Sequence, residues 1–373
     1  MKNDFHLKDG LIYLNHAGVS PWPLRTARAV EDFAGENAAQ GSYNYPQWIR
    51  TETALRIKAK ELLNAGSKDD IAFLKNTSEA LSVVAYGLPW KKGDNIVSSS
   101  QEFPSNRIVW ESLAGKGVEF READLYSAET PEDALFCLVN GSTRLITISS
   151  VQYSTGLRMD LKRIGEFCKE KNILFCVDAI QSLGAMQFDA LDIHADFVMA
   201  DGHKWMLGPE GLAIFYSTPE ARERLSLNQY GWHMVERMGD FDRREWETAK
   251  TARCFECGSP NILGIHALNA SLSLLLDTGM ENIEKEVLNR SEYLFNKIRS
   301  MPELEFITST ETGRYAGIVT FRHKRADNAG LYQYLAANNV VCAMRAGGIR
   351  LSPHYYTPYE HLDRVMEMVA GYN

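Results

Sequence analysis

The sequence lacks the features that mark disulfide-rich, membrane-spanning and nucleotide-binding chains. Its 373 residues include six cysteines, too few for a disulfide scaffold. No run approaches the about 18 apolar residues of a membrane-spanning helix, and the richest run, residues 270–276, is short and holds two serines. Neither glycine-rich phosphate motif, G-x-G-x-x-G after the first strand or G-x-x-x-x-G-K-[ST], is present. The corresponding classes are therefore excluded.

A large excess of charge of one sign is also missing. Lys and Arg number 40 and Asp and Glu 48, so a formal net charge of −8 predicts no general attraction to nucleic acid or to an anionic membrane. The first ten residues, MKNDFHLKDG, are polar and lack the apolar segment of a signal peptide. With so few cysteines, we expect a cytoplasmic protein. Cys254 and Cys257 have C-x-x-C spacing but no second ligand pair, so we expect no metal site.

What is present is an ordinary globular composition, with 45% hydrophobic and 24% charged residues. The length predicts roughly two to three domains. Between about residues 70 and 216, short apolar runs alternate with helical patterns, and continuous apolar strands of this kind indicate a mostly parallel sheet covered on both faces. The expected strands are residues 71–74, 95–98, 145–149, 173–177, 197–199 and 212–216.

The last third of the chain has a different pattern. Residues 260–300 read as long helix, and two strand-like runs, 304–307 and 317–321, follow. A helix near 327–338, strands near 340–344 and 349–352, and a closing helix complete the chain; Leu362, Val365, Met366 and Val369 form the apolar stripe of that last helix. We interpret this region as a smaller α+β domain, with the boundary between residues 255 and 280.

Ligands of parallel sheets bind beyond the carboxyl ends of the strands, so residues there are the first candidates. Thr77 and Ser78 open a helix after the first strand, where N–H and hydroxyl groups suit a phosphate, although a plain helix cap has the same sequence. Asp178 ends the most apolar strand. It is either an anion that binds a cationic partner or a cap for the helix that follows. Lys204 follows the next strand, where a solvated surface lysine is the alternative.

The combination is more specific than its parts. Pyridoxal 5′-phosphate (PLP) needs donors for its phosphate, a carboxylate for its ring nitrogen and a lysine that forms a Schiff base with its aldehyde. Thr77 and Ser78 supply the phosphate donors, Asp178 supplies the carboxylate and Lys204 supplies the amine. The sequence therefore predicts PLP as the cofactor.

These residues carry a resemblance to a known family. The chain resembles the class V aminotransferase group of fold-type-I PLP enzymes, which includes cysteine desulfurases, selenocysteine lyases and isopenicillin N epimerase. The matching pieces run from YLNHA at 13–17 through VDAIQ at 177–181 and HKW at 203–205 to FECGSPN at 255–261. The resemblance implies an N-terminal segment (1–25) that packs on the small domain, a large PLP-binding domain (26–255) with a seven-stranded sheet, and a smaller α+β domain (256–373).

The resemblance also implies roles around the cofactor. Lys204 would form the Schiff base and then move a proton at the substrate α-carbon. Asp178 would pair with the ring nitrogen and Gln181 would hydrogen-bond the phenolic oxygen. His203, Thr77 and Ser78 would hold the phosphate, and the ring of Phe103 would stack on the cofactor where many relatives have histidine.

Further roles concern the partner subunit and the substrate. Ser259 matches a hydroxyl that reaches the phosphate of a neighbouring subunit, which implies a homodimer with shared active sites. Arg350 matches the arginine that binds a substrate carboxylate, Arg345 is a second candidate, and surface ion pairs are the alternative for both. Asn15 and His16 are expected beside the substrate, with a plain turn histidine as the alternative for His16.

Three departures from the desulfurase pattern bear on function. The interval between Arg345 and Arg350 holds no cysteine, and Cys342 precedes it on a predicted strand, so a persulfide-forming desulfurase is disfavoured. Asp201 stands where desulfurases often have serine, and a carboxylate there would repel a phosphate. An asparagine of the desulfurases is replaced in the segment 151–156, where either Gln152 or Tyr153 faces the cofactor.

The expected activity is that of a PLP-dependent enzyme acting on an α-amino acid. Transamination is our main interpretation, with C–S or β-lyase chemistry ranked about equal and epimerisation behind. A non-catalytic PLP-binding protein is a fourth hypothesis. Lys204, Asp178 and Arg350 together argue against it, because a scaffold has no use for a carboxylate clamp that faces a reactive aldehyde.

Overall fold

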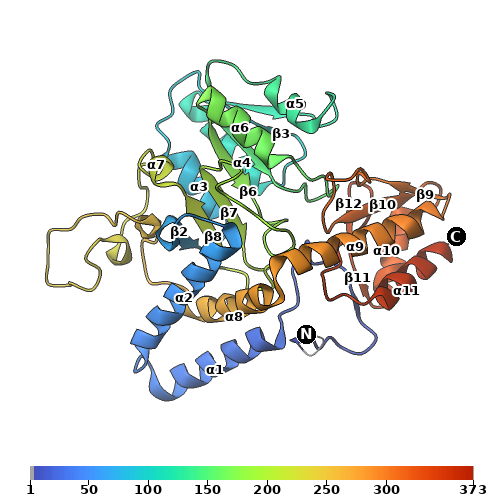
Figure 1. Ribbon diagram of the computed structural model, residues 1–373, viewed down its shortest axis with the longest axis horizontal. Coiled ribbons are helices and arrows are strands. Elements are labelled where there is room, and N and C mark those ends of the chain that lie inside the picture. Colours follow the sequence, from blue (N-terminus) through green and yellow to red (C-terminus); the bar gives the residue numbers. More distant parts are fainter. Residues whose placement is uncertain (1–3, 373) are drawn as a thin grey trace.

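The computed structural model describes residues 4–372, so residues 1–3 of the expected N-terminal segment and residue 373 lie outside the described residues. Within that range the chain forms a seven-stranded sheet with its helices, and a smaller unit built on a four-stranded sheet, at the right of Figure 1. A two-stranded pairing joins the N-terminal segment to the smaller unit.

The large sheet confirms the predicted α/β class. Its strands, in spatial order, are β2 (Ile71–Leu74), β8 (Ala213–Ser217), β7 (Phe197–Asp201), β6 (Leu174–Asp178), β5 (Thr143–Ser149), β3 (Asn95–Ser99) and β4 (Glu119–Ala123). The pairs from β7 to β4 are parallel, whereas β8 runs antiparallel to both neighbours. All strands but β4 are buried along their whole length or nearly so, which explains their continuous apolar sequences.

Helices cover both faces of this sheet, and a separate apolar core lies on each face. The helices that follow strands within the sheet are α3 (Thr77–Gly87), α4 (Ser105–Glu111), α5 (Pro131–Phe136), α6 (Leu161–Lys171) and α7 (Pro219–Arg222). A second group, α1 (Leu24–Gln40), α2 (Tyr45–Leu63) and α8 (Ile262–Thr278), packs together at the bottom of Figure 1. Single 3₁₀ turns are η2 (Lys68–Asp70), η3 (Ser112–Lys116), η4 (Trp232–Met234) and η5 (Ala252–Phe255).

The smaller unit is built on an antiparallel sheet in the order β12 (Ala343–Arg345), β13 (Gly348–Leu351), β10 (Val319–His323) and β9 (Leu304–Phe306). Helices α9 (Met280–Arg299), α10 (Asn328–Ala337) and α11 (Tyr359–Ala370) close its own apolar core. The apolar side chains of α8 belong instead to the core of the large sheet. We therefore propose that the small unit begins at Gly279, where a φ of +84° breaks the helix, rather than at residue 256.

The N-terminal segment crosses from the small unit to the large one. Strand β1 (Ile12–Tyr13) pairs with β11 (Val340–Val341), and Asn15 forms a bridge with Ser352. These contacts hold residues 12–17 at the junction of the two units. Among residues 4–372, no single helix is long and apolar enough to cross a membrane; α8 and α9 reach that length and hydropathy only when taken together, across a bend of 83°.

Candidate active site

The carboxyl ends of β5, β6 and β7 meet at one edge of the large sheet, near the small unit. In the register of these strands, Ser149 pairs with Asp178, and Asp178 with Met199. Lys204 follows β7 at this edge. Both Asp178 and Lys204 are buried, as predicted for a site rather than for a solvated surface lysine.

Burial changes the proton affinity of both groups. Desolvation, and next the nearby Glu102 carboxylate, raises the pKa of Asp178 to about 7. Desolvation lowers the pKa of Lys204 to about 8, although the Asp178 carboxylate opposes that shift. The uncharged amine, which is the form that reacts with an aldehyde, is therefore more abundant near neutral pH than for an exposed lysine.

The N-terminus of α3 provides donors beside β7. The amide of Asp201 donates to the Thr77 hydroxyl oxygen over 3.2 Å, and the Ser78 hydroxyl donates to Ser105 over 2.9 Å. The helix cap itself is Asn76, which accepts from the Glu79 amide. Thr77 and Ser78 are thus not needed as the cap, and their amides stay at the positive end of the helix dipole.

His203 directly precedes Lys204 in the chain. Its Nδ1 is 3.1 Å from Oδ1 of Asp201, but both atoms are buried without a hydrogen-bond partner of proper geometry among the described residues. The Asp201 carboxylate therefore faces the histidine. The phosphate role expected of His203 stays a prediction.

Aromatic rings cover Lys204. Its Nζ lies 5.6 Å from the centroid of the Phe103 ring, which is 40% exposed, and the Tyr153 ring meets Phe103 edge-on at 5.1 Å. Gln152 is fully buried and donates to the Glu102 carboxylate over 3.0 Å. Of the two alternatives left open by the sequence, Tyr153 is the one beside Phe103.

Gln181 has partners at both ends of its amide. Nε2 donates to the Ala17 carbonyl over 3.1 Å, and Oε1 accepts from the Trp205 indole over 2.9 Å. One amide N–H of Gln181 is left without a partner among residues 4–372. That N–H is the group that the predicted bond to a cofactor oxygen requires.

His16 and Asn15 come together with these residues but differ in access. His16 is fully buried; its Nδ1 lies 2.8 Å from the Ser352 carbonyl oxygen and its Nε2 2.7 Å from the Tyr356 hydroxyl. Desolvation lowers the pKa of His16 to about 4. Both ring nitrogens thus have protein partners, and the predicted position of His16 beside a substrate stays a prediction. Asn15 instead accepts from Arg350.

Arg350 is the buried cation that the sequence predicts. It is 2% exposed, and its two hydrogen bonds go to neutral oxygens, the Tyr153 carbonyl at 2.7 Å and Asn15 Oδ1 at 3.1 Å. Its Nε has no partner in the described part of the chain. Desolvation, and next Arg345, lowers the pKa of Arg350 to about 10. An unpaired buried guanidinium is unfavourable unless an anion binds to it.

Arg345 and Ser259 lie at the margins. Arg345 is exposed and donates to the Met344 carbonyl, with no carboxylate partner in the described residues. Ser259 lines a surface hollow with Lys75 and Gly211, beyond β2 and β8. Its predicted contact with a partner subunit stays a prediction.

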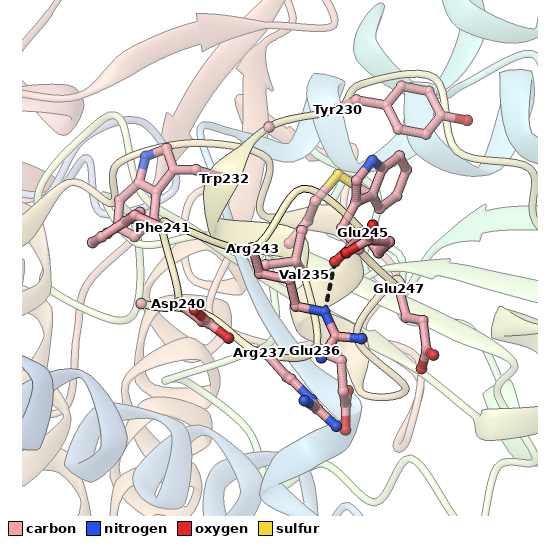
Figure 2. Close-up of a pocket in the computed structure, with 14 residues that line it drawn as sticks. Tyr230, Trp232, Val235, Glu236, Arg237, Asp240, Phe241, Arg243, Glu245 and Glu247 are labelled. Carbon is pink, nitrogen blue, oxygen red and sulfur yellow. Dashed lines mark hydrogen bonds between the residues drawn. The ribbon is translucent and has the colours of Figure 1, made fainter.

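Another surface hollow lies elsewhere, in the loop between α7 and α8. This loop stands away from the body at the left of Figure 1, and Figure 2 shows the hollow inside it. Tyr230, Trp232 and Phe241 line it together with charged side chains, and Arg243 Nε donates to the Glu245 carbonyl over 2.9 Å. None of the predicted cofactor residues lines this hollow, so the loop is not the reaction centre of this chain.

One compact acidic cluster resembles a metal site. Glu52, His233 and Glu256 are buried with their ligand atoms within 4.8 Å of one another. The guanidinium of Arg56, however, lies 2.5 Å from Glu52 and 2.6 Å from Glu256. The arginine already supplies the positive charge that a cation would bring.

Sequence reasoning missed two buried residues that touch the site. Glu102 accepts hydrogen bonds from the Ser149 amide and from Gln152 and raises the pKa of Asp178. Trp205 binds Gln181. The only sequence signal for a role in the site was that Glu102 precedes Phe103 and Trp205 follows Lys204.

The residues present fit PLP. Asp178, Lys204 and Arg350 are buried near the carboxyl edge, Arg350 Nε has no partner in the described residues, and a helix N-terminus lies beside them. A carboxylate, an amine with a lowered pKa, an aromatic ring and phosphate donors are the set that this cofactor requires.

The fold and this site define the class of fold-type-I PLP-dependent enzymes. The comparison with family models agrees: residues 12–361 match the model described as aminotransferase class-V. The chain belongs to the class V aminotransferase family, as the sequence motifs predicted, and PLP is its cofactor.

Relatives and solved structures extend this result. A probable cysteine desulfurase of Methanothermobacter thermautotrophicus is 31% identical over 100% of this chain and 98% of its own length. The uncharacterized aminotransferase YcbU of Bacillus subtilis is 28% identical, over 92% of this chain and 90% of its own. The cystine C–S lyase C-DES has the same fold, with a TM-score of 0.90 and 21% identity over 98% of both chains. The cysteine desulfurase CsdA of Escherichia coli gives a TM-score of 0.85 at 21% identity, over 97% of this chain and 94% of its own.

Proposed function

We propose that the protein is a PLP-dependent lyase that cleaves the C–S bond of a sulfur-containing α-amino acid. The observation that carries the proposal is the buried Arg350, whose Nε has no partner in the described residues, at the same sheet edge as Lys204, whose pKa burial lowers to about 8. The relatives named as cysteine desulfurases favour C–S cleavage over transamination, our main interpretation from sequence. The choice between these reactions rests on those relatives and on the cysteines described below.

The chain's own residues have distinct tasks in this reaction. Arg350 binds the substrate carboxylate and fixes the α-carbon relative to Lys204. Lys204 in its uncharged form removes the α-proton, and Asp178 holds the ring nitrogen of the cofactor. PLP, when bound, draws electrons away from the α-carbon.

The net reaction is a β-elimination followed by hydrolysis. An amino acid of the form R–S–CH₂–CH(NH₃⁺)–COO⁻ and one water give pyruvate, ammonium and R–SH. The C–S bond breaks with its electron pair on sulfur, which takes up the proton that left the α-carbon. No oxidant or reductant is required.

The positions of the cysteines argue against transfer of sulfur to the protein. Strands β12 and β13 join through a two-residue turn, because Arg345 pairs with Gly348, and Ala346 and Gly347 have φ of +48° and +74°. This turn leaves no loop that could carry a thiol to the substrate. Cys342 is buried nearby, and desolvation raises its pKa to about 12, so it is a poor nucleophile.

The experiment is a product assay on PLP-loaded protein with cysteine, cystine and S-alkylcysteines. We expect pyruvate and thiol or sulfide in equal amounts without an added keto acid, no product from Lys204→Ala, and full activity from Cys342→Ala. Alanine with a persulfide on the protein would identify a desulfurase. A strict need for a keto acid acceptor would identify a transaminase, and either result would refute the proposal.

A further inference from the structure

The side chain that follows Lys204 in the chain has a specific contact. Trp205 is fully buried, and its indole Nε1 donates to Oε1 of Gln181 over 2.9 Å. Gln181 in turn donates from Nε2 to the carbonyl of Ala17 over 3.1 Å. The indole and the carbonyl thus hold the Gln181 amide from two directions.

These two partners determine which way the amide faces. An indole N–H can only donate and a carbonyl oxygen can only accept. Turning the amide by 180° would set its oxygen against the Ala17 carbonyl and its NH₂ against the indole N–H. Only the observed orientation therefore keeps both bonds, and it fixes the place of the remaining N–H of Gln181.

The indole itself is held by the small unit. A Cβ placed on Gly317, just before β10, would lie 2.4 Å from Cη2 of Trp205. The carbonyl of Trp205 lies 3.0 Å from His354 Nε2. Glycine at 317 is thus needed for the indole to occupy its position, and the ring spans from the small unit to Gln181.

We propose that Trp205 is a positioning residue that orients Gln181, so that an amide N–H and not the amide oxygen faces the phenolic oxygen of the cofactor. This inference rests on the proposed function, because it assumes cofactor linked to Lys204. Trp205 acts through Gln181 and itself touches no reacting atom.

The test is the pH midpoint of the visible absorbance of PLP-loaded protein. An N–H from Gln181 stabilises negative charge on the phenolic oxygen, which weakens proton binding at the nitrogen that joins Lys204 to the cofactor. Trp205→Phe removes the indole N–H, so the proton binds more tightly. We expect the midpoint to rise by roughly one pH unit, the effect of one hydrogen bond to a charged group.

A double-mutant cycle shows whether the effect passes through Gln181. Gln181→Leu alone is expected to raise the midpoint by at least as much, and Trp205→Phe is expected to add nothing further in that background. Trp48→Phe is the matched control. Trp48 lies on helix α2, and its indole N–H donates to Glu36 of helix α1 over 2.7 Å, so this change should lower Tm without moving the midpoint.

Two results would overturn the proposal: an unchanged midpoint in Trp205→Phe, or the same shift with and without Gln181. If Trp205→Phe does not fold, benzothienylalanine at 205 keeps the ring size without the N–H and gives the same reading. These measurements need only bound cofactor. Failure of the proposed function would appear separately, as wild-type protein that binds PLP but releases no thiol.

Discussion

At the scale of single residues, the account depends on the protonation of Lys204. Its pKa of about 8, below the ordinary 10.5, follows from burial. We expect the rate of PLP attachment to apo-protein to rise with pH through a midpoint near 8, because only the uncharged amine attacks the aldehyde. Stopped-flow absorbance at a series of pH values measures this, and a midpoint near 10.5 would contradict the buried position.

The lowered pKa of Lys204 also affects the folding stability of the apo-protein. The unfolded chain binds a proton at Lys204 up to about pH 10.5 and the folded chain only below about 8, so this residue makes the apo-protein more stable as pH rises through that window. Asp178 acts oppositely between pH 3.8 and about 7, where the folded state holds the extra proton. Near neutral pH both groups therefore destabilise the empty site.

Arg350 gives a second prediction at this scale. Arg350→Lys keeps a charge but loses the planar pair of donors, so we expect kcat/KM for an amino acid to fall roughly 100-fold, mostly through KM. For cysteamine, which has no carboxylate, the change should be small. Arg345→Lys is the control, since Arg345 is exposed. Equal losses for both substrates would contradict a carboxylate contact.

At the scale of elements, a buried ion cluster holds α2 against the segment after η5. Arg56 bridges Glu52 and Glu256, and Glu256 also accepts from the Phe73 amide of β2. Arg56→Ala leaves two buried carboxylates without a cation and should cost about 3–5 kcal/mol of unfolding free energy. Denaturant unfolding measures it. The exposed pair Arg107–Glu111 is the control, and Arg107→Ala should cost less than about 1 kcal/mol.

The comparison between sequence and structure is clearest for elements. The buried strands were predictable because a short continuous apolar run bounded by turn residues is typical of a buried strand. Strand β4 was missed, because it is an edge strand whose exposed residues include Glu119 and Glu122. The antiparallel direction of β8 depends on pairing between distant segments, which no local pattern contains.

Some features of the site were likewise predictable from the sequence and others were not. Asp178 and Lys204 were predictable because Asp178 ends one buried strand and Lys204 follows the next. The Gln181–Trp205 bond and the approach of Glu102 to Asp178 could not be, because they depend on side-chain packing after the strands assemble. The burial of both His16 nitrogens depends likewise on the distant Ser352 and Tyr356.

At the scale of the whole molecule, we expect a homodimer, as the match of Ser259 to a shared phosphate contact implies. Light scattering after gel filtration should give twice the 42.0 kDa of one chain. Mixed dimers test whether the two subunits share their active sites. Inactive Lys204→Ala chains and weakly active Ser259→Ala chains should together form one active site of wild-type composition. A fully active monomer would contradict the expectation.

The central claim is that Lys204 carries the cofactor, and one measurement tests it most directly. PLP-loaded protein is reduced with borohydride, digested and analysed by peptide mass spectrometry. The account predicts a pyridoxyl phosphate mass on the peptide containing Lys204 and none on this peptide from Lys204→Ala. A modification on another lysine, with the Lys204 peptide unmodified, would contradict it.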